Sequence, residues 1–304
     1  MTYSRFLELF PDNDACLEYL RGKFFADGSE CPGCGRETKF FRIKSRAAYS
    51  CQYCRHQVYP TAGTVFNKST VSLQLWFFAI YLMSSTRCGI SAKQLEREIG
   101  VTYKTAHRMF KMIRTLLSDE GEGPLSGKVE VDESAGGGRV RASDTAKGKR
   151  HVRAKVSLRP TIWAAVERGG RVRPKVVKSR GTLDVEQPIF QHVLPSSMIF
   201  TDEWLGYTHR VGDHFAGHRR IRHEDRIYVQ GDVHTQTVEG FFGLFKNGVR
   251  GVYHAISTTY LQDYLDEYAF RYNRRGSSTP MFWAMLNRVE KASRPRLDAR
   301  PLGS

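Results

Sequence analysis

The sequence has no long hydrophobic run. Its longest apolar stretch, Leu75–Met83, is nine residues, whereas a helix needs about 20 to cross a bilayer. The opening residues, MTYSRFLELF, also lack the apolar core of a secretory signal peptide. We therefore expect a soluble, cytoplasmic protein with no membrane partner.

Acidic residues are scarce relative to basic ones. The chain has 31 Asp and Glu against 47 Lys and Arg, so its formal net charge at pH 7 is +16. An excess of this size attracts polyanions, and nucleic acid is the commonest of these. A hydrophobic fraction of 40% excludes wholesale disorder. A length of 304 residues is enough for about two or three compact units.

Cysteine is rare and unevenly placed. Four of the six cysteines form two C-x2-C pairs sixteen residues apart, namely Cys31, Cys34, Cys51 and Cys54. Each pair can direct two thiolates at one ion, and the two pairs complete a closed tetrahedral site that is typical of one structural zinc. Gly33 and Gly35 permit the tight turns. A rubredoxin-like iron site has similar spacing and remains an alternative.

The hydrophobic periodicity changes once along the chain. Helical spacing dominates up to an acidic, glycine-containing linker at 118–126, and strand-like alternation begins after it. The pattern predicts five segments: an N-terminal helix (1–28), a zinc ribbon (29–60), a helix-turn-helix DNA-binding domain (61–118), an α/β catalytic domain with a mixed sheet (126–278), and a C-terminal helix and tail (279–304).

The third segment carries the helix-turn-helix pattern. Two helical stretches meet at Gly100, and the second, Tyr103–Arg114, has a basic side and an apolar side. The start of the second helix meets base edges in such motifs. The candidate DNA-binding residues there are Tyr103, Lys104, His107 and Arg108. A helical hairpin with solvated charges is the alternative.

A basic, glycine-rich stretch follows the linker. Residues 136–159 contain eight Lys and Arg, which is typical of a mobile arm that contacts phosphates. Its candidate DNA-binding residues are Arg139, Arg141, Lys147, Lys149 and Arg150. Elsewhere in the α/β segment the pattern predicts strands at 128–132, 161–167, 172–178 and 198–202, and helices at 183–193, 236–246 and 259–272. It predicts a further helix at 280–291.

Three carboxylates are placed where a catalytic site can form. Asp132 and Asp202 each end a predicted strand, and Glu239 lies near the start of a predicted helix. Two-metal phosphoryl transfer needs convergent carboxylates, and Mg²⁺ (or Mn²⁺) favours oxygen ligands. The acids flanking these positions are alternatives that the pattern leaves open: Glu130, Glu133 and Glu203.

Two sets of residues follow on the predicted helices. Lys246 lies seven residues after Glu239, on the same helix face, and is a candidate phosphate-binding group. Glu267, Arg271 and Arg274 are spaced i, i+4, i+7; they either support the site or DNA, or form an ordinary helix ion pair. For Glu239 and Lys246 the alternative is a solvated pair on the helix surface.

Several stretches together resemble a known family. They are the CPxCG and CxxC knuckles, GISAKQLEREIGVTYKTAHRM, VEVDES, TDEWLGY, HTQTVEGFFGLFKNGVRGVYH and LDEYAFRYNRR. In this order they resemble bacterial insertion-sequence transposases of the DDE type with an N-terminal zinc ribbon, the ISXO2-like family. The resemblance covers nearly the whole chain.

The resemblance implies a ribonuclease H-like catalytic domain and a DDE triad followed by a lysine. By position these roles fall on Asp132, Asp202, Glu239 and Lys246. The family's downstream E–R–R signature falls on Glu267, Arg271 and Arg274. Relatives tend to have Asn where Gln236 stands, so Gln236 is a supporting candidate. His234 either orients a ligand or phosphate, or is structural.

The expected function is therefore end nicking and strand transfer of an insertion sequence, with two Mg²⁺ (or Mn²⁺) per active site and one structural Zn²⁺. The expected partners are double-stranded DNA, as transposon ends and target, and further copies of the chain in a dimer or higher assembly. A catalytically idle DNA-binding regulator and a ribonuclease H-like nuclease are the alternatives.

Overall fold

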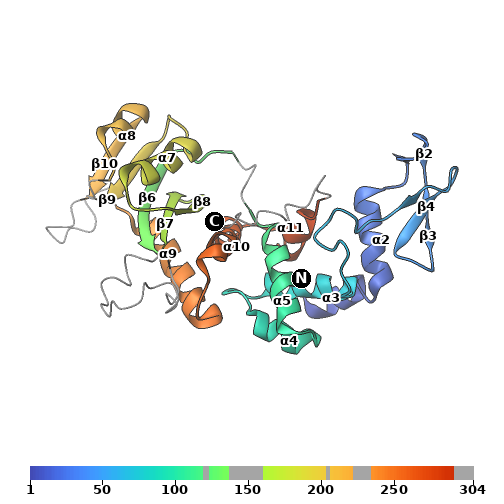
Figure 1. The fold of residues 1–304 in the computed structure, drawn as a ribbon. Helices are drawn as coiled ribbons and strands as arrows, with labels where there is room; N and C mark the ends of the chain where they lie inside the picture. The colour runs from blue at the N-terminus through green and yellow to red at the C-terminus, as the bar shows by residue number, and fades with distance from the viewer. Residues whose placement is uncertain (119–122, 137–159, 203–205, 222–233, 291–304) are drawn as a thin grey trace, which may run out of the picture. The chain divides into compact units, whose positions relative to one another are not determined.

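The computed structural model describes residues 1–118, 123–136, 160–202, 206–221 and 234–290 (Figure 1). Contacts divide the chain into two compact units. The first comprises residues 1–87, 92–116 and the described part of 279–304, and the second comprises residues 88–91 and 117–278.

The first unit is mainly helical. Its helices are α1 (Tyr3–Leu9), α2 (Asn13–Phe24), α3 (Leu73–Ser85), α4 (Ala92–Ile99), α5 (Tyr103–Arg114) and α11 (Met281–Asn287). The apolar run forms α3, and its N-cap Ser72 accepts a hydrogen bond from Leu75 N. Helix α2 is capped by Asp12, which accepts from Ala15 N at 2.8 Å. Asn13 instead accepts from Gln74 N at the start of α3.

An aromatic cluster holds these helices together. The ring centroids of Phe10 and Phe77 lie 5.0 Å apart, and those of Phe6 and Phe282 lie 5.9 Å apart. Phe282 belongs to α11, which therefore packs with α1 and α3 although more than 190 residues of sequence separate it from α3. Buried aromatic pairs of this kind add specific geometry to the burial of apolar area.

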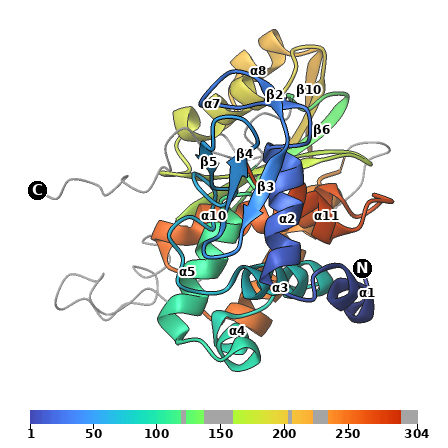
Figure 2. The same ribbon diagram turned by 90° about the vertical axis from the view of Figure 1, so that its right-hand side faces the viewer.

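Two small antiparallel sheets complete the first unit. One joins β1 (Ser29–Glu30) and β2 (Glu37–Thr38); the other has the order β3 (Phe40–Ile43), β4 (Ala48–Cys51), β5 (Gln57–Val58). Phe40, Tyr49 and two of the cysteines pack with Leu17 of α2, and Figure 2 shows α2 beside β3 and β4. The small ribbon is too short to form a hydrophobic core of its own, so its apolar side chains pack against one face of α2.

The second unit is built on a mixed sheet. Its strands are β6 (Lys128–Ala135), β7 (Thr161–Glu167), β8 (Val172–Val177), β9 (Met198–Asp202) and β10 (Gly217–Ile221). The order is β10-β9-β6-β7-β8: β6, β7 and β8 run antiparallel, whereas β9 runs parallel to both β6 and β10. The other elements are α7 (Thr182–His192), α8 (His209–His214), α9 (Gln236–Gly248), the π-helical turn η2 (Val249–Tyr253), the 3-10 turn η3 (Thr258–Tyr260) and α10 (Leu261–Asn273).

Helices cover both faces of this sheet. On β7, Ile162, Ala164 and Val166 pack with α9 and α10, while the alternate residues Trp163 and Ala165 pack with α7. Figure 1 shows α7 and α9 on opposite sides of the strands. The mixed sheet with helices on both faces is consistent with the predicted ribonuclease H-like domain.

Candidate active site and metal centre

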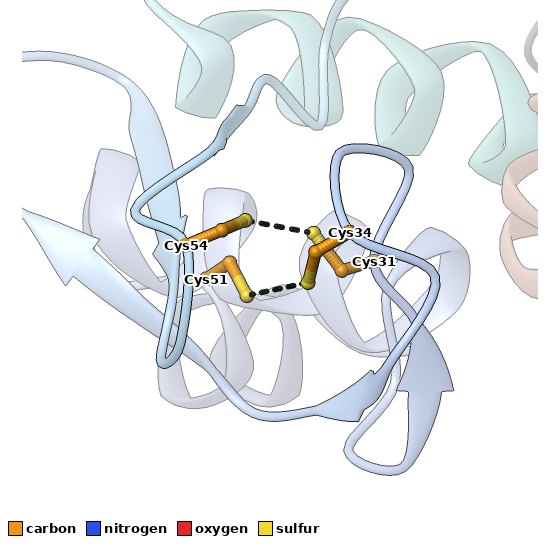
Figure 3. A group of neighbouring side chains, drawn as sticks. All are labelled: Cys31, Cys34, Cys51 and Cys54. Carbon is orange, nitrogen blue, oxygen red and sulfur yellow. Dashed lines mark hydrogen bonds between the residues drawn. The ribbon is translucent and has the colours of Figure 1, made fainter.

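The four paired cysteines converge on one point. Their sulfur atoms all lie within 4.8 Å of one another, with 3.6 Å between those of Cys31 and Cys54 and 4.0 Å between those of Cys34 and Cys51 (Figure 3). Gly33 N–H and Tyr53 N–H point at the sulfurs of Cys31 and Cys51. This donor set fits one tetrahedral, structural ion such as zinc.

The two knuckles use the same turn with different residues. Gly35 has φ +69° and Arg55 has φ +61°, each directly after its second cysteine. Gly33 is required for a different reason: a Cβ there would lie 2.6 Å from the Cγ of His56. The expectation that Gly33 eases the turn is therefore refined, because Gly33 provides room for the second knuckle rather than a left-handed backbone.

The sheet register brings Asp132 and Asp202 to one edge and one face. Strands β6 and β9 are parallel neighbours, with Glu130 opposite Phe200. Two residues further along each strand lie Asp132 and Asp202, on the same face because side chains alternate. Asp202 ends β9, and this face is the one that α9 covers.

The pKa of Asp132 reflects the charges of both other predicted carboxylates. It is raised to about 6, first by burial and then by the negative charges of Asp202 and Glu239, while a hydrogen bond from Glu133 N lowers it. That hydrogen bond is 2.7 Å long and ends on Oδ1 of Asp132. Glu239 lies in the first turn of α9. The charges of Asp202 and Glu239 therefore act on Asp132, although the four cysteines are the only group of His, Cys, Asp and Glu side chains among the described residues whose ligand atoms lie together at metal-binding distances.

A fourth acid lies beside them on the opposite face. The pKa of Glu133 is raised to about 8. Burial is the largest cause, and the negative charges of Asp132 and Asp202 add to it. Its Oε1 is buried without a hydrogen-bond partner among the described residues. Arg180 lowers the pKa of both Asp132 and Glu133 and had no signal in the sequence, because it lies in a short loop before α7. Glu203 lies outside the described residues.

Glu130 has a different task. It is fully buried and accepts hydrogen bonds from Thr237 N at 2.8 Å and Val238 N at 3.1 Å. Its carboxylate thus caps the N-terminus of α9, where unpaired N–H groups and the helix dipole favour a negative charge. Strand β6 therefore holds α9, which carries Glu239, through a residue two positions before Asp132.

Arg168 and His234 complete this contact. Arg168 Nε donates to Glu130 Oε1 at 2.7 Å, and its guanidinium lies 4.1 Å from the ring centroid of Phe200. Arg168 also donates to the carbonyl of His234, whose Nδ1 lies 3.1 Å from Glu130 Oε1. His234 therefore lies against the helix anchor, which favours the structural alternative for this residue.

The remaining helix residues are placed as follows. Lys246 is half-buried, with its Nζ 5.7 Å from the ring centroid of Phe242. Gln236 is exposed at the first position of α9. Arg274 lies with its guanidinium 4.0 Å from the ring centroid of Phe270.

Glu267 and Arg271 form a buried ion pair on α10. Arg271 donates to Glu267 Oε1 at 2.7 Å, and both side chains are almost fully buried. The phenol hydroxyl of Tyr253 donates a hydrogen bond to Glu267 Oε1 at 3.4 Å. A Cβ at Gly89 would lie 2.1 Å from that phenol oxygen, so the chain at Gly89 packs directly on the pair.

Three of the four DNA-reading residues predicted on α5 are open to solvent, and His107 is half-buried. On α5, Tyr103, Lys104 and Arg108 are exposed. The pKa of His107 is lowered by burial first, and the positive charges of Arg114 and Lys111 lower it further. The opposite side of α5 is buried, as the pattern predicts, through Ala106, Met109, Phe110 and Ile113. The arm residues Arg139, Arg141, Lys147, Lys149 and Arg150 lie outside the described residues.

No helix in the described part of the chain is long and apolar enough to span a bilayer.

Comparisons with known proteins agree with this picture. A transposase zinc-ribbon domain matches residues 11–57, and an ISXO2-like transposase domain matches residues 124–273. A relative from Halobacterium salinarum, described as an uncharacterized protein in transposable element ISH50, is 29% identical over 251 residues. The alignment covers 78% of this chain and 84% of the relative.

A four-cysteine ribbon, a helical segment and a mixed sheet with helices on both faces, together with the two matched domains, define a transposase of the DDE class. Within that class the chain belongs to the ISXO2-like family with an N-terminal zinc ribbon. The family predicted from the motifs is confirmed. Because the matching relative is archaeal, a bacterial origin stays a prediction.

Proposed function

We propose that this chain is a metal-dependent transposase that nicks the ends of an insertion sequence and joins the freed 3′-hydroxyls to target DNA. The observation that supports the proposal is the sheet register, which places Asp132 and Asp202 on one edge and on the face that α9 covers, with Glu239 in the first turn of α9. The charges of Asp202 and Glu239 add to the burial that raises the pKa of Asp132 to about 6. A cation would relieve this repulsion, and carboxylate oxygens are donors that fit Mg²⁺ or Mn²⁺.

The chemistry requires the carboxylates to be held rigidly. Two bound cations would activate the attacking oxygen and stabilise the leaving oxygen of the phosphodiester. Asp132 and Asp202 are fixed by neighbouring parallel strands, and Glu239 is fixed because Glu130 anchors α9 to β6. Glu133 N–H orients the Asp132 carboxylate. Strands and a capped helix preorganise such a site better than loops do.

The supporting residues act on the substrate or on the site. We assign Lys246 to a DNA phosphate, because it lies seven residues beyond Glu239 on the same helix. Gln236, at the start of that helix, is assigned a supporting role beside Glu239. Glu267 and Arg271 support α10 through their buried pair, and the position of Arg274 beside Phe270 fits the same role.

The front end is proposed to recognise the transposon ends. The exposed start of α5 carries Tyr103, Lys104, His107 and Arg108, and the start of a second helix commonly enters the major groove. The lowered pKa of His107 favours the neutral ring, which can both donate to and accept from base edges. The basic arm would add contacts to phosphates.

Double-stranded DNA is the proposed partner, as transposon ends and as target. At least two copies of the chain are proposed to act together, because two ends must be processed in one reaction. The proposed place of action is the cytoplasm, where the DNA of such an element lies. One structural zinc is proposed for the four-cysteine site, with iron as the alternative that elemental analysis of the purified protein distinguishes.

A transposition assay tests the proposal. The donor is a plasmid marker flanked by the element's own ends, and the reaction contains Mg²⁺ or Mn²⁺. We expect joined product from the unaltered chain and none from Asp202→Asn. The matched control is Asp213→Asn, because Asp213 is an exposed aspartate of the same unit and its change leaves product formation unaltered.

The other outcomes discriminate between functions. Equal product from Asp202→Asn and the unaltered chain would remove the carboxylates from the mechanism. End binding without any cleavage would favour the regulator, and cleavage without joining would favour the nuclease.

A further inference from the structure

A basic groove lies in the first unit, away from the four cysteines and from α5. It has a volume of about 570 Å³. One wall is the hairpin that joins β3 to β4, with Arg42, Lys44 and Arg46. The other wall is the segment that leads into α3, with Lys68 and Thr70.

The charge of the groove is one-sided. Four cations line it, namely Arg42, Lys44, Arg46 and Lys68, against a single carboxylate, Asp14. That carboxylate is already paired with Arg42 at 2.8 Å. Lys44 and Lys68 are both exposed, one on each wall. The groove therefore offers positive charge from both segments, and Ser45 and Thr70 add hydroxyl-bearing residues to its lining.

Both walls are held in shape. Lys68 has φ +52°, an uncommon value for a residue with a side chain. The next residue fixes that turn, because Ser69 Oγ accepts from Trp76 Nε1 at 2.8 Å and from Val71 N at 3.1 Å. Arg42 fixes the hairpin by donating to the carbonyls of Ile43 and Arg46. Non-glycine residues in the left-handed region are held only where their surroundings require it.

We propose that this groove holds the sugar-phosphate backbone of double-stranded DNA. A strand of phosphates placed between the two walls would meet Lys44 on one side and Lys68 on the other, and hydroxyls can donate to the same oxygens. The groove would be a second DNA contact of the first unit, in addition to α5. The inference rests on the DNA-binding part of the proposed function and not on its chemistry.

The test measures binding of the full chain to a labelled duplex of about 30 base pairs with scrambled sequence, at salt concentrations from roughly 50 to 200 mM and without Mg²⁺. The test variant is Lys44→Gln/Lys68→Gln. The control variant is Arg5→Gln/Lys39→Gln, which removes the same charge from exposed positions of the same unit outside the groove. Zinc content and the melting curve confirm that each variant is folded.

Each phosphate contact contributes about 0.9 to the slope of log affinity against log salt. We expect the groove variant to lower that slope by about 2 and the control to change it far less. Charge reversal, as Lys44→Glu/Lys68→Glu, should weaken binding further. Equal slopes for the groove and control variants would overturn the inference. A groove-dependent slope in a chain without strand transfer would leave it standing while the proposed chemistry fails.

Discussion

Gly33 and Gly22 show how differently one residue type can be used. Gly33 sits in the first zinc knuckle, where a Cβ would lie 2.6 Å from Cγ and 2.7 Å from Cβ of His56. Gly22 lies inside α2, and a Cβ there meets nothing within 4 Å. The first glycine is required by a neighbour close to its own backbone, while the second only weakens a helix.

We therefore expect Gly33→Ala to weaken metal binding at the four-cysteine site and Gly22→Ala to stabilise the first unit. The first change forces the two knuckles apart at a cost of about 1–3 kcal/mol. The second raises helix propensity and the free energy of unfolding by roughly 0.5–1 kcal/mol. Metal release to a chelator and thermal melting measure the two effects. Unchanged metal release in Gly33→Ala would contradict the assignment.

Asp132 gives a prediction in pH. Its pKa is raised from 3.8 to about 6 in the folded chain, so the folded state binds the proton more tightly than the unfolded state. Its contribution to stability is complete below pH 3.8 and is lost as the pH rises through about 6. Without added Mg²⁺, Asp132→Asn should therefore stabilise the protein at neutral pH by about 3 kcal/mol.

Denaturant unfolding at several pH values measures this gain, with Asp213→Asn as the control. The gain should vanish toward pH 4 and shrink when Mg²⁺ is added, because the cation relieves the repulsion in the unaltered chain only. A gain in stability that is the same at all these pH values would show that the pKa of Asp132 is not raised in the folded chain.

At the scale of elements, the contact between β6 and α9 sets the geometry of the site. The alternation of residues 128–132 predicted a strand, and the helix from Gln236 was also predicted; both are confirmed. The role of Glu130 could not be predicted, because its partners Arg168 and Thr237 lie 38 and 107 residues away. From the sequence it was only one more acid next to Asp132.

Other parts of the fold lacked a local signal. Strand β10 reads GHRRI and was not predicted, because it is an edge strand beside β9 alone, and edge strands tolerate charge. For residues 1–28 a single helix was predicted, whereas the chain forms two there, α1 and α2. The seven residues of α1 depend on packing against distant aromatic rings. Strand 198–202 was predicted with its observed bounds, because a short apolar run between turn residues is a strong local pattern.

Removing the Glu130 carboxylate should release α9. Glu130→Ala removes the buried carboxylate that Arg168 and the first N–H groups of α9 contact, which costs about 3–5 kcal/mol. Glu130→Gln keeps the shape and one acceptor oxygen and should cost less. The control Glu8→Ala breaks an exposed ion pair with Arg5, which contributes at most about 1 kcal/mol. Equal melting of Glu130→Ala and Glu8→Ala would contradict the anchor.

At the scale of the molecule, the four-cysteine site and the sheet belong to different units. The site stabilises more than its own loops, because Cys31 and Cys51 pack with Leu17 of α2 and near Leu73 of α3. Folding of such small ribbons depends on the bound metal. Loss of the metal should therefore destabilise α2 and α3, while the core strands of the sheet keep their own hydrophobic contacts.

Hydrogen exchange of Cys54→Ala tests this, with Cys88→Ala as the control, because Cys88 is exposed and lies outside the four-cysteine group. We expect Cys54→Ala to lose its metal and the protection of amides in 29–58, α2 and α3, and to keep that of β6, β7 and β9. Cys88→Ala should keep both. Because the sheet carries the carboxylates and the ribbon carries the basic groove, the same variant should retain divalent-cation binding while losing affinity for DNA. Loss of both together would mean that the two units fold as one.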